Sequence, residues 1–217
     1  MIRALIFDMD GLMIDTEHLY WEVGRELAHE HGKTVSDGTL RRMMGRDRLA
    51  SSRIFAQETG VPLAPEAVMT QREAKMLERF NRGGIEPMRG LREILERFHG
   101  RLRLGVATSS PRILVEAALP AIGVDRYFDT ITAGDEITSG KPDPEIYLKT
   151  MSKLQVTPET TVVLEDAPAG ALAGMRSGAY VIAVPSPLTA QEDFSQVATM
   201  RVNDLFEAAE QIERTLG

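Results

Sequence analysis

The chain has 217 residues, of which 43% are hydrophobic and 26% are charged, a composition typical of one globular domain or of a domain that carries an insertion. Its 25 basic and 32 acidic side chains give a formal net charge of -7, which disfavours the nucleic-acid backbone as a partner but not a small anionic substrate. The absence of cysteine excludes disulfides, zinc–thiolate sites and thiol catalysis.

The first residues, MIRALIFDMDG, carry charges after only a few apolar positions, so they lack the apolar core of a signal peptide. No apolar run of the sequence is long enough to span a bilayer. We therefore expect a cytoplasmic protein without a membrane or nucleic-acid partner, and a monomer is the default expectation.

Short apolar runs predict the buried strands of a parallel sheet, at residues 4–7, 102–107, 161–164 and 180–184, with a weaker candidate at 130–133. Runs such as TVVL and VIAV are β-branched and nearly continuous, as in strands covered on both faces. Between the runs, Ser, Asp or Thr followed by proline at 110–111, 143–144 and 157–158 predicts three helix starts. The alternation of strands and helices predicts an α/β fold with a Rossmann-like parallel sheet.

One region, from about residue 16 to residue 83, breaks this alternation because it contains no convincing strand. Four amphipathic stretches predict an inserted helical bundle there: HLYWEVGRELAHEHG, GTLRRMMG, RLASSRIFAQETG and APEAVMTQREAKMLERF. The glycines and proline of residues 81–87 have the composition of a hinge. The expected domains are an α/β catalytic core of residues 1–15 and 84–217 and an all-helical cap of residues 16–83.

Polar residues follow four of the five predicted strands, at the sheet edge where ligands of open parallel sheets bind. The sets are Asp8 and Asp10, then Thr108 with Ser109 and Ser110, then residues 139–144 with Lys141, and finally Glu165 and Asp166. Four neighbouring acids are unfavourable without a cation, and oxygen ligands without cysteine indicate Mg²⁺. The combination of acids, hydroxyls and a lysine suits a metal-dependent phosphate site.

Acids, hydroxyls and a lysine in one place can together transfer a phosphoryl group. A carboxylate can attack phosphorus and form an acyl-phosphate, while a second carboxylate moves protons to the leaving oxygen and from water. Lys141 adds a positive charge beside the phosphate. Thr108, together with the backbone N–H groups of Ser109 and Ser110 at a helix start, can hold phosphoryl oxygens.

These residues resemble the motifs of the haloacid dehalogenase-like hydrolase superfamily, in the same order along the chain. FDMDGLMIDTE is similar to its first motif, VATSS to its second, SGKPDPEIY to its third and VVLEDAPAGALAG to its fourth. The inserted bundle lies where the β-phosphoglucomutase-like phosphatases, the subgroup that the chain most resembles, carry a helical cap.

The resemblance implies a role for each matching residue of the core. Asp8 would be the nucleophile and Asp10 the general acid and base. Asp8, the Asp10 backbone carbonyl, and Glu165 or Asp166 would hold Mg²⁺.

Three further residues of the core, and two of the cap, receive roles from the resemblance. Thr108 and the Ser109 backbone would bind the transferring phosphoryl group, and Lys141 would steady the nucleophile. Gly45 and Arg48, in the predicted cap, would contact the substrate.

The leading hypothesis is a Mg²⁺-dependent phosphatase that hydrolyses a small phosphorylated metabolite, with a sugar phosphate as the expected substrate, through an aspartyl-phosphate at Asp8. The alternative is a phosphosugar mutase of the β-phosphoglucomutase type. Tyr20 disfavours it, because the mutases carry a histidine there and His18 is out of register. A non-catalytic phosphoacceptor or sensor domain is a distant alternative, which the order of the acids and the insert disfavour.

Overall fold

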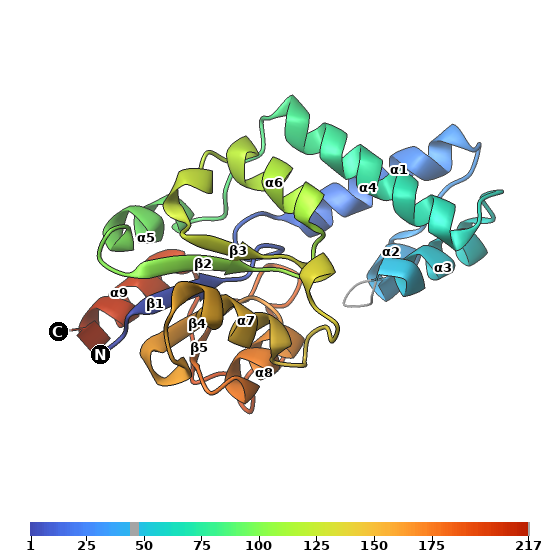
Figure 1. Ribbon diagram of the computed structural model, residues 1–217. Coiled ribbons are helices and arrows are strands. Elements are labelled where there is room, and N and C mark those ends of the chain that lie inside the picture. Colours follow the sequence, from blue (N-terminus) through green and yellow to red (C-terminus); the bar gives the residue numbers. More distant parts are fainter. Residues whose placement is uncertain (44–47, 217) are drawn as a thin grey trace. The chain divides into compact units, whose positions relative to one another are not determined.

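The computed structural model of the chain describes residues 1–43 and 48–216. They form two compact units, Met1–Asp15 with Gly84–Gly217, and Thr16–Gly83. The first unit is built on a parallel sheet and the second consists of helices (Figure 1). Among the described residues, no helix is both long and apolar enough to cross a membrane.

Six parallel strands form the sheet of the first unit, in the order β3-β2-β1-β4-β5-β6. Their bounds are β1 Ala4–Phe7, β2 Arg103–Ala107, β3 Thr130–Thr132, β4 Thr161–Glu165, β5 Tyr180–Ala183 and β6 Met200–Arg201. Strand β1 is central, and its Phe7 is level with Val106 of β2 and Leu164 of β4. The residues that follow these three strands therefore meet at one edge, at the point where the strand order reverses.

The sheet is covered on both faces, which explains why its strands are apolar throughout. Helices α7 (Glu145–Leu154) and α8 (Pro168–Arg176) lie on one face, whereas α5 (Leu91–Phe98), α6 (Arg112–Ala121) and α9 (Leu205–Leu216) lie on the other (Figure 1). Side chains of alternate strand positions, including Ile6, Val163 and Val181, form one core cluster with residues of α7 and α8. The hydrophobic cores thus hold the central strands, and with them the residues at their ends, in fixed positions.

A charge network joins the end of β3 to the helices beside it. Glu136 closes the short 3₁₀ helix η2 (Gly134–Glu136) and accepts hydrogen bonds from Arg112 of α6, from Lys153 of α7 at 2.7 Å and from the Ala133 N–H at 3.0 Å. Burial alone would raise the pKa of Glu136, but these donors outweigh it and lower that pKa from 4.5 to about 2. The carboxylate therefore stays charged and ties two helices to the loop after β3.

The α/β prediction is confirmed, and the five predicted strands correspond to β1 to β5. Strand β6 was not expected, because it has only two residues and one of them, Arg201, is exposed. The helix starts expected at 110–111 and 143–144 were one residue early, since Pro111 and Pro144 are themselves the N-cap residues. Thr157 does cap a helix, but the helix is a single 3₁₀ turn, η3 (Pro158–Thr160).

The described residues of the second unit form four helices: α1 (Thr16–Glu30), α2 (Asp37–Met43), α3 (Arg48–Thr59) and α4 (Pro65–Arg82). They correspond to the four amphipathic stretches of the sequence. Their core contains Leu27, Leu40, Phe55 and Val68, one from each helix and all buried. On the surface, Lys75 of α4 donates hydrogen bonds to Glu26 and Glu30 of α1 and so links the first and last helices.

Candidate active site

Asp8 continues the central strand by one residue beyond β1, because its N–H donates to the Leu164 carbonyl of β4 at 3.0 Å. The side chain is only 5% exposed. Three residues later the chain turns sharply, and Gly11 has a φ of +82°. A Cβ at Gly11 would lie 2.2 Å from Asp166 Oδ2, so the turn brings bare backbone against that acid.

Lys141 joins Asp8 to Glu165 of the neighbouring strand β4. Its buried Nζ donates hydrogen bonds to Asp8 Oδ1 at 2.5 Å, to Glu165 Oε1 at 2.6 Å and to the Ala107 carbonyl at 3.3 Å. Burial alone would lower the pKa of Lys141, but the charges of Asp8 and Glu165 raise it well above its usual range. The side chain is therefore an ammonium ion fixed beside Asp8.

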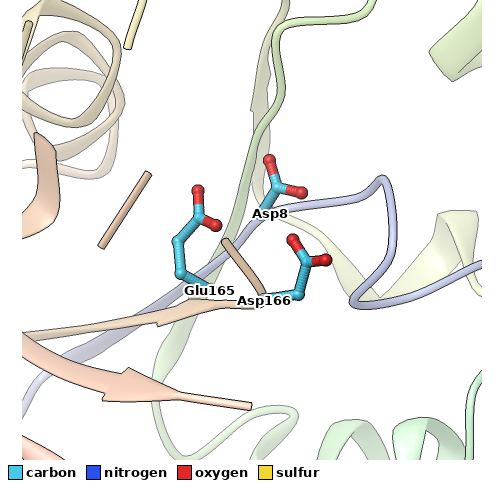
Figure 2. A group of neighbouring side chains, drawn as sticks. All are labelled: Asp8, Glu165 and Asp166. Carbon is cyan, nitrogen blue, oxygen red and sulfur yellow. The ribbon is translucent and has the colours of Figure 1, made fainter. Parts of the chain in front are cut away.

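Three buried carboxylates gather at this edge of the sheet, as Figure 2 shows for Asp8, Glu165 and Asp166. One oxygen from each lies within 4.8 Å of the others. Burial and the charge of Glu165 raise the pKa of Asp8 and of Asp166, and Lys141 only partly offsets this. Three carboxylates against one ammonium leave an excess of negative charge that is unfavourable in a buried site.

The donor set of this cluster fits a hard divalent cation. Mg²⁺ prefers oxygen ligands such as carboxylates, and it would supply the positive charge that the three acids lack. Glycine at the start of α8 makes room for one of the acids, because a Cβ at Gly170 would lie 1.8 Å from Glu165 Oε1. The Glu165 carboxylate thus lies directly against the helix backbone.

Asp10 is held by two hydroxyl groups from the segment after β2. Thr108 Oγ1 and Ser110 Oγ both donate to Asp10 Oδ2, at 2.9 and 2.8 Å. The Ser110 N–H in turn donates to Thr108 Oγ1 at 3.1 Å. These bonds fix the second aspartate two residues from Asp8, at the same end of the sheet.

Tyr147 of α7 contributes a further contact to the acids. The side chain is fully buried, and its hydroxyl donates to Glu165 Oε1 at 2.5 Å. Burial and the neighbouring charge of Glu165 raise the pKa of Tyr147 well above its usual value. The phenol therefore keeps its proton and acts as a hydrogen-bond donor.

The structure brings most of the candidate residues together. Asp8, Glu165, Asp166 and Lys141 form one buried cluster, and Asp10 is joined to Thr108 by a hydrogen bond. Ser109, in the same segment, is exposed, and its carbonyl packs so closely on Gly134 that a Cβ there would lie 2.1 Å from it.

The two cap candidates belong to the other unit. Arg48 begins α3, and its Nη1 donates to Glu73 Oε1 at 2.5 Å. Gly45 lies outside the described residues.

Three contributions were missed by the sequence analysis: the Tyr147 hydroxyl, the Ser110 hydroxyl and the backbone of Gly170. Tyr147 and Gly170 lie within the motifs SGKPDPEIY and VVLEDAPAGALAG, so the sequence placed both near the site. The motifs did not indicate that both residues contact Glu165. The contact of Tyr147 joins residues 18 positions apart, and only the packing of α7 on the sheet creates it.

Comparison with known proteins identifies a family. The family model for haloacid dehalogenase-like hydrolases matches residues 5–184. A phosphorylated carbohydrates phosphatase of Thermotoga maritima is 35% identical over 189 residues, which cover 82% of each chain. A validoxylamine A 7'-phosphate phosphatase of Streptomyces hygroscopicus subsp. limoneus is 34% identical over 193 residues, covering 84% of this chain and 85% of that one.

A solved structure shares the fold. The crystal structure of CbbY from Rhodobacter sphaeroides in complex with phosphate superposes with a TM-score of 0.85. The two proteins are 26% identical, and the match covers 95% of this chain and 96% of the other.

Proposed function

The chain belongs to the haloacid dehalogenase-like hydrolase family and is a phosphoric monoester hydrolase, and we propose that it hydrolyses a small phosphorylated carbohydrate through an aspartyl-phosphate at Asp8. The observation that carries this proposal is the position of Asp8. It is buried, joined to the Lys141 ammonium at 2.5 Å and next to two further acids. The relatives, a phosphorylated carbohydrates phosphatase and a validoxylamine A 7'-phosphate phosphatase, support the substrate class.

The first half of the reaction forms a covalent bond to the chain. A carboxylate oxygen of Asp8 attacks phosphorus, and the bond from phosphorus to the carbohydrate oxygen breaks. Asp10 donates a proton to the leaving oxygen. Lys141 offsets the repulsion between the Asp8 carboxylate and the phosphoryl oxygens.

The second half restores Asp8. The Asp10 carboxylate takes a proton from water, the water oxygen bonds to phosphorus, and the acyl-phosphate bond breaks to release inorganic phosphate. Thr108 and the Ser109 backbone N–H would hold the phosphoryl oxygens in both halves.

The metal proposal rests on the charge and type of the acid cluster. Asp8, the Asp10 backbone carbonyl, Glu165 and Asp166 are the residues that would hold Mg²⁺. When bound, Mg²⁺ would supply the positive charge that lets a carboxylate and a phosphate approach each other.

The helical unit has a role of its own in this proposal. The helical unit would act as the cap that selects the substrate, with Gly45 and Arg48 as contacts. A cytoplasmic location and a monomeric state are also predictions.

The proposal predicts that the purified protein, given Mg²⁺, releases inorganic phosphate from at least one member of a panel of phosphorylated carbohydrates. Asp8→Asn should reduce this release at least ~10⁴-fold, because the amide cannot form the acyl-phosphate. The measurement is phosphate release together with identification of the carbohydrate product.

Each rival function has its own outcome in this experiment. Conversion of a hexose 1-phosphate into its 6-phosphate, with little phosphate released, would support the mutase. Binding without turnover of any compound would support the sensor, and full activity of Asp8→Asn would rule out Asp8 as the nucleophile.

A further inference from the structure

Tyr147 has a polar group that the mechanism above does not use. Its ring is buried in the core cluster between the sheet and helices α7 and α8, together with Ile6, Ala107 and Val163. A phenylalanine would fill the same apolar space. The hydroxyl, in contrast, reaches out of this cluster and donates to Glu165 Oε1 at 2.5 Å.

The partner of this hydroxyl is an acid whose orientation is under several constraints. Glu165 is 1% exposed, and its Oε1 accepts from both Tyr147 and Lys141, at 2.5 and 2.6 Å. Its Oε2 accepts only a longer bond, from the Ala167 N–H at 3.3 Å. The two strong donors thus engage one oxygen and leave the other with a weaker contact.

Lys141 cannot fix Glu165 alone, because the same ammonium is also joined to Asp8 at 2.5 Å. Any shift of Asp8 or Lys141 would change the Lys141–Glu165 contact. The Tyr147 hydroxyl gives its hydrogen to Glu165 and not to Asp8; it is carried by helix α7, whereas Asp8 follows β1, and the tyrosine ring is buried in the core. It is therefore the donor that can hold Glu165 steady while the rest of the site changes.

We propose that Tyr147 is a positioning residue that orients Glu165 for a divalent cation bound by Asp8, Glu165 and Asp166. The proposal rests on the metal site of the proposed function and deepens it. Groups that orient metal ligands through hydrogen bonds typically change metal affinity or activity 10–100-fold when they are removed. The hydroxyl of Tyr147 has that position here, and its loss would let the Glu165 carboxylate rotate away from the other two.

The test uses the full chain with Tyr147→Phe, which keeps the ring and removes only the hydroxyl. Mn²⁺ is the probe, and the free ion is measured by electron paramagnetic resonance during titration. We expect the Mn²⁺ Kd to rise about 10-fold or more. A cooperative melting transition without metal shows that the variant is folded. Phosphatase activity should recover towards that of the wild type when Mg²⁺ is raised in proportion.

Tyr127→Phe is the matched control. Tyr127 is also buried, but its hydroxyl accepts a bond from Arg126 and is not among the site contacts. This variant should bind Mn²⁺ as the wild type does. A rise of Kd in Tyr127→Phe equal to that in Tyr147→Phe would overturn the proposal.

A double-mutant cycle with Glu165→Gln tests whether Tyr147 acts through Glu165. The two substitutions should be strongly non-additive in the Mn²⁺ Kd, because the hydroxyl has no ligand left to orient. Additive effects, or an unchanged Kd in Tyr147→Phe, would overturn the role of Tyr147 and leave the proposed function intact. Absence of Mn²⁺ binding by the wild-type chain would instead overturn the metal site itself, and with it this inference.

Discussion

At the scale of single residues, two glycines of the site act by having no side chain. Gly11 lies in the turn after β1 and Gly170 in helix α8, and they bring bare backbone against Asp166 and Glu165, respectively. Gly11 also needs its left-handed φ of +82°. Gly170 does not, because it lies in helix α8, where alanine is the better helix former. Glycine is therefore required at position 170 because of its contact with Glu165, and not because of the helix.

Gly170→Ala should disrupt the acid cluster although alanine is the better helix former. The new Cβ would lie 1.8 Å from Glu165 Oε1 and would displace that buried carboxylate from its bonds to Lys141 and Tyr147. Loss of these bonds outweighs the helix preference of alanine, which is about 1 kcal/mol, so the free energy of unfolding should fall. We expect kcat/KM and Mn²⁺ affinity to fall at least ~10-fold.

The measurements for Gly170→Ala are thermal unfolding without metal and a Mn²⁺ titration. Gly38→Ala in helix α2 is the control, since the nearest atom to its new Cβ is 3.4 Å away. Unchanged stability together with retained metal affinity in Gly170→Ala would contradict the expectation.

At the scale of secondary-structure elements, Glu136 is the residue that ties α6 and α7 to the loop after β3. Its pKa is lowered from 4.5 to about 2, so its contribution to stability is present above about pH 4.5 and is lost as the pH falls towards 2. A shift of this size corresponds to about 3 kcal/mol. Because the side chain is 26% exposed and screened by water, we expect about 1–2 kcal/mol.

Glu136→Gln should therefore lower the free energy of unfolding at pH 7 by about 1–2 kcal/mol and flatten its decline between about pH 4.5 and pH 2. Chemical unfolding at a series of pH values measures both effects. Glu210→Gln is a suitable control, because Glu210 is 62% exposed and its nearest cation is 3.9 Å away. Equal pH dependence in Glu136→Gln and the wild type would show that the network does not stabilise the fold.

Individual strands could be predicted from the sequence where their signals are local. The central strands β1 and β4 and the acids at their ends were found, because continuous apolar runs and the ends of parallel strands are local signals. Strand β6 escaped, because two residues at a sheet edge bury too little to leave a pattern.

The contacts between elements were harder to predict. The Tyr147–Glu165 contact escaped, because it depends on how α7 packs on the sheet. Hydroxyls and tyrosines near an active site are common, and periodicity does not reveal which acid each of them reaches.

At the scale of the whole molecule, the acid cluster needed for function lowers the stability of the fold. The chain already carries a formal net charge of -7, and Asp8, Glu165 and Asp166 concentrate three acids in a buried place. Burial and mutual repulsion raise the pKa of Asp8 and Asp166, so the charged forms destabilise the fold until a cation is present. Stability should therefore depend on Mg²⁺.

Mg²⁺ at 100 times its Kd should stabilise the wild-type chain by about 2.7 kcal/mol, which corresponds to a rise in melting temperature of roughly 5–10 °C. Asp166→Asn should melt higher than the wild type without metal and should lose most of the response to Mg²⁺. Differential scanning calorimetry with Mg²⁺ or with a chelator measures both. A variant that melts lower without metal would show that Asp166 stabilises the fold as an anion.

The three contacts of Lys141 set a limit on what it can do for a substrate. An ammonium has three hydrogens, and Asp8, Glu165 and the Ala107 carbonyl use all of them. An arriving phosphoryl oxygen can gain a hydrogen from Lys141 only by replacing one of these acceptors, and the Ala107 carbonyl, at 3.3 Å, holds its hydrogen least tightly. Substrate binding would then be an exchange of acceptors, in which the backbone carbonyl at the end of β2 is the leaving partner.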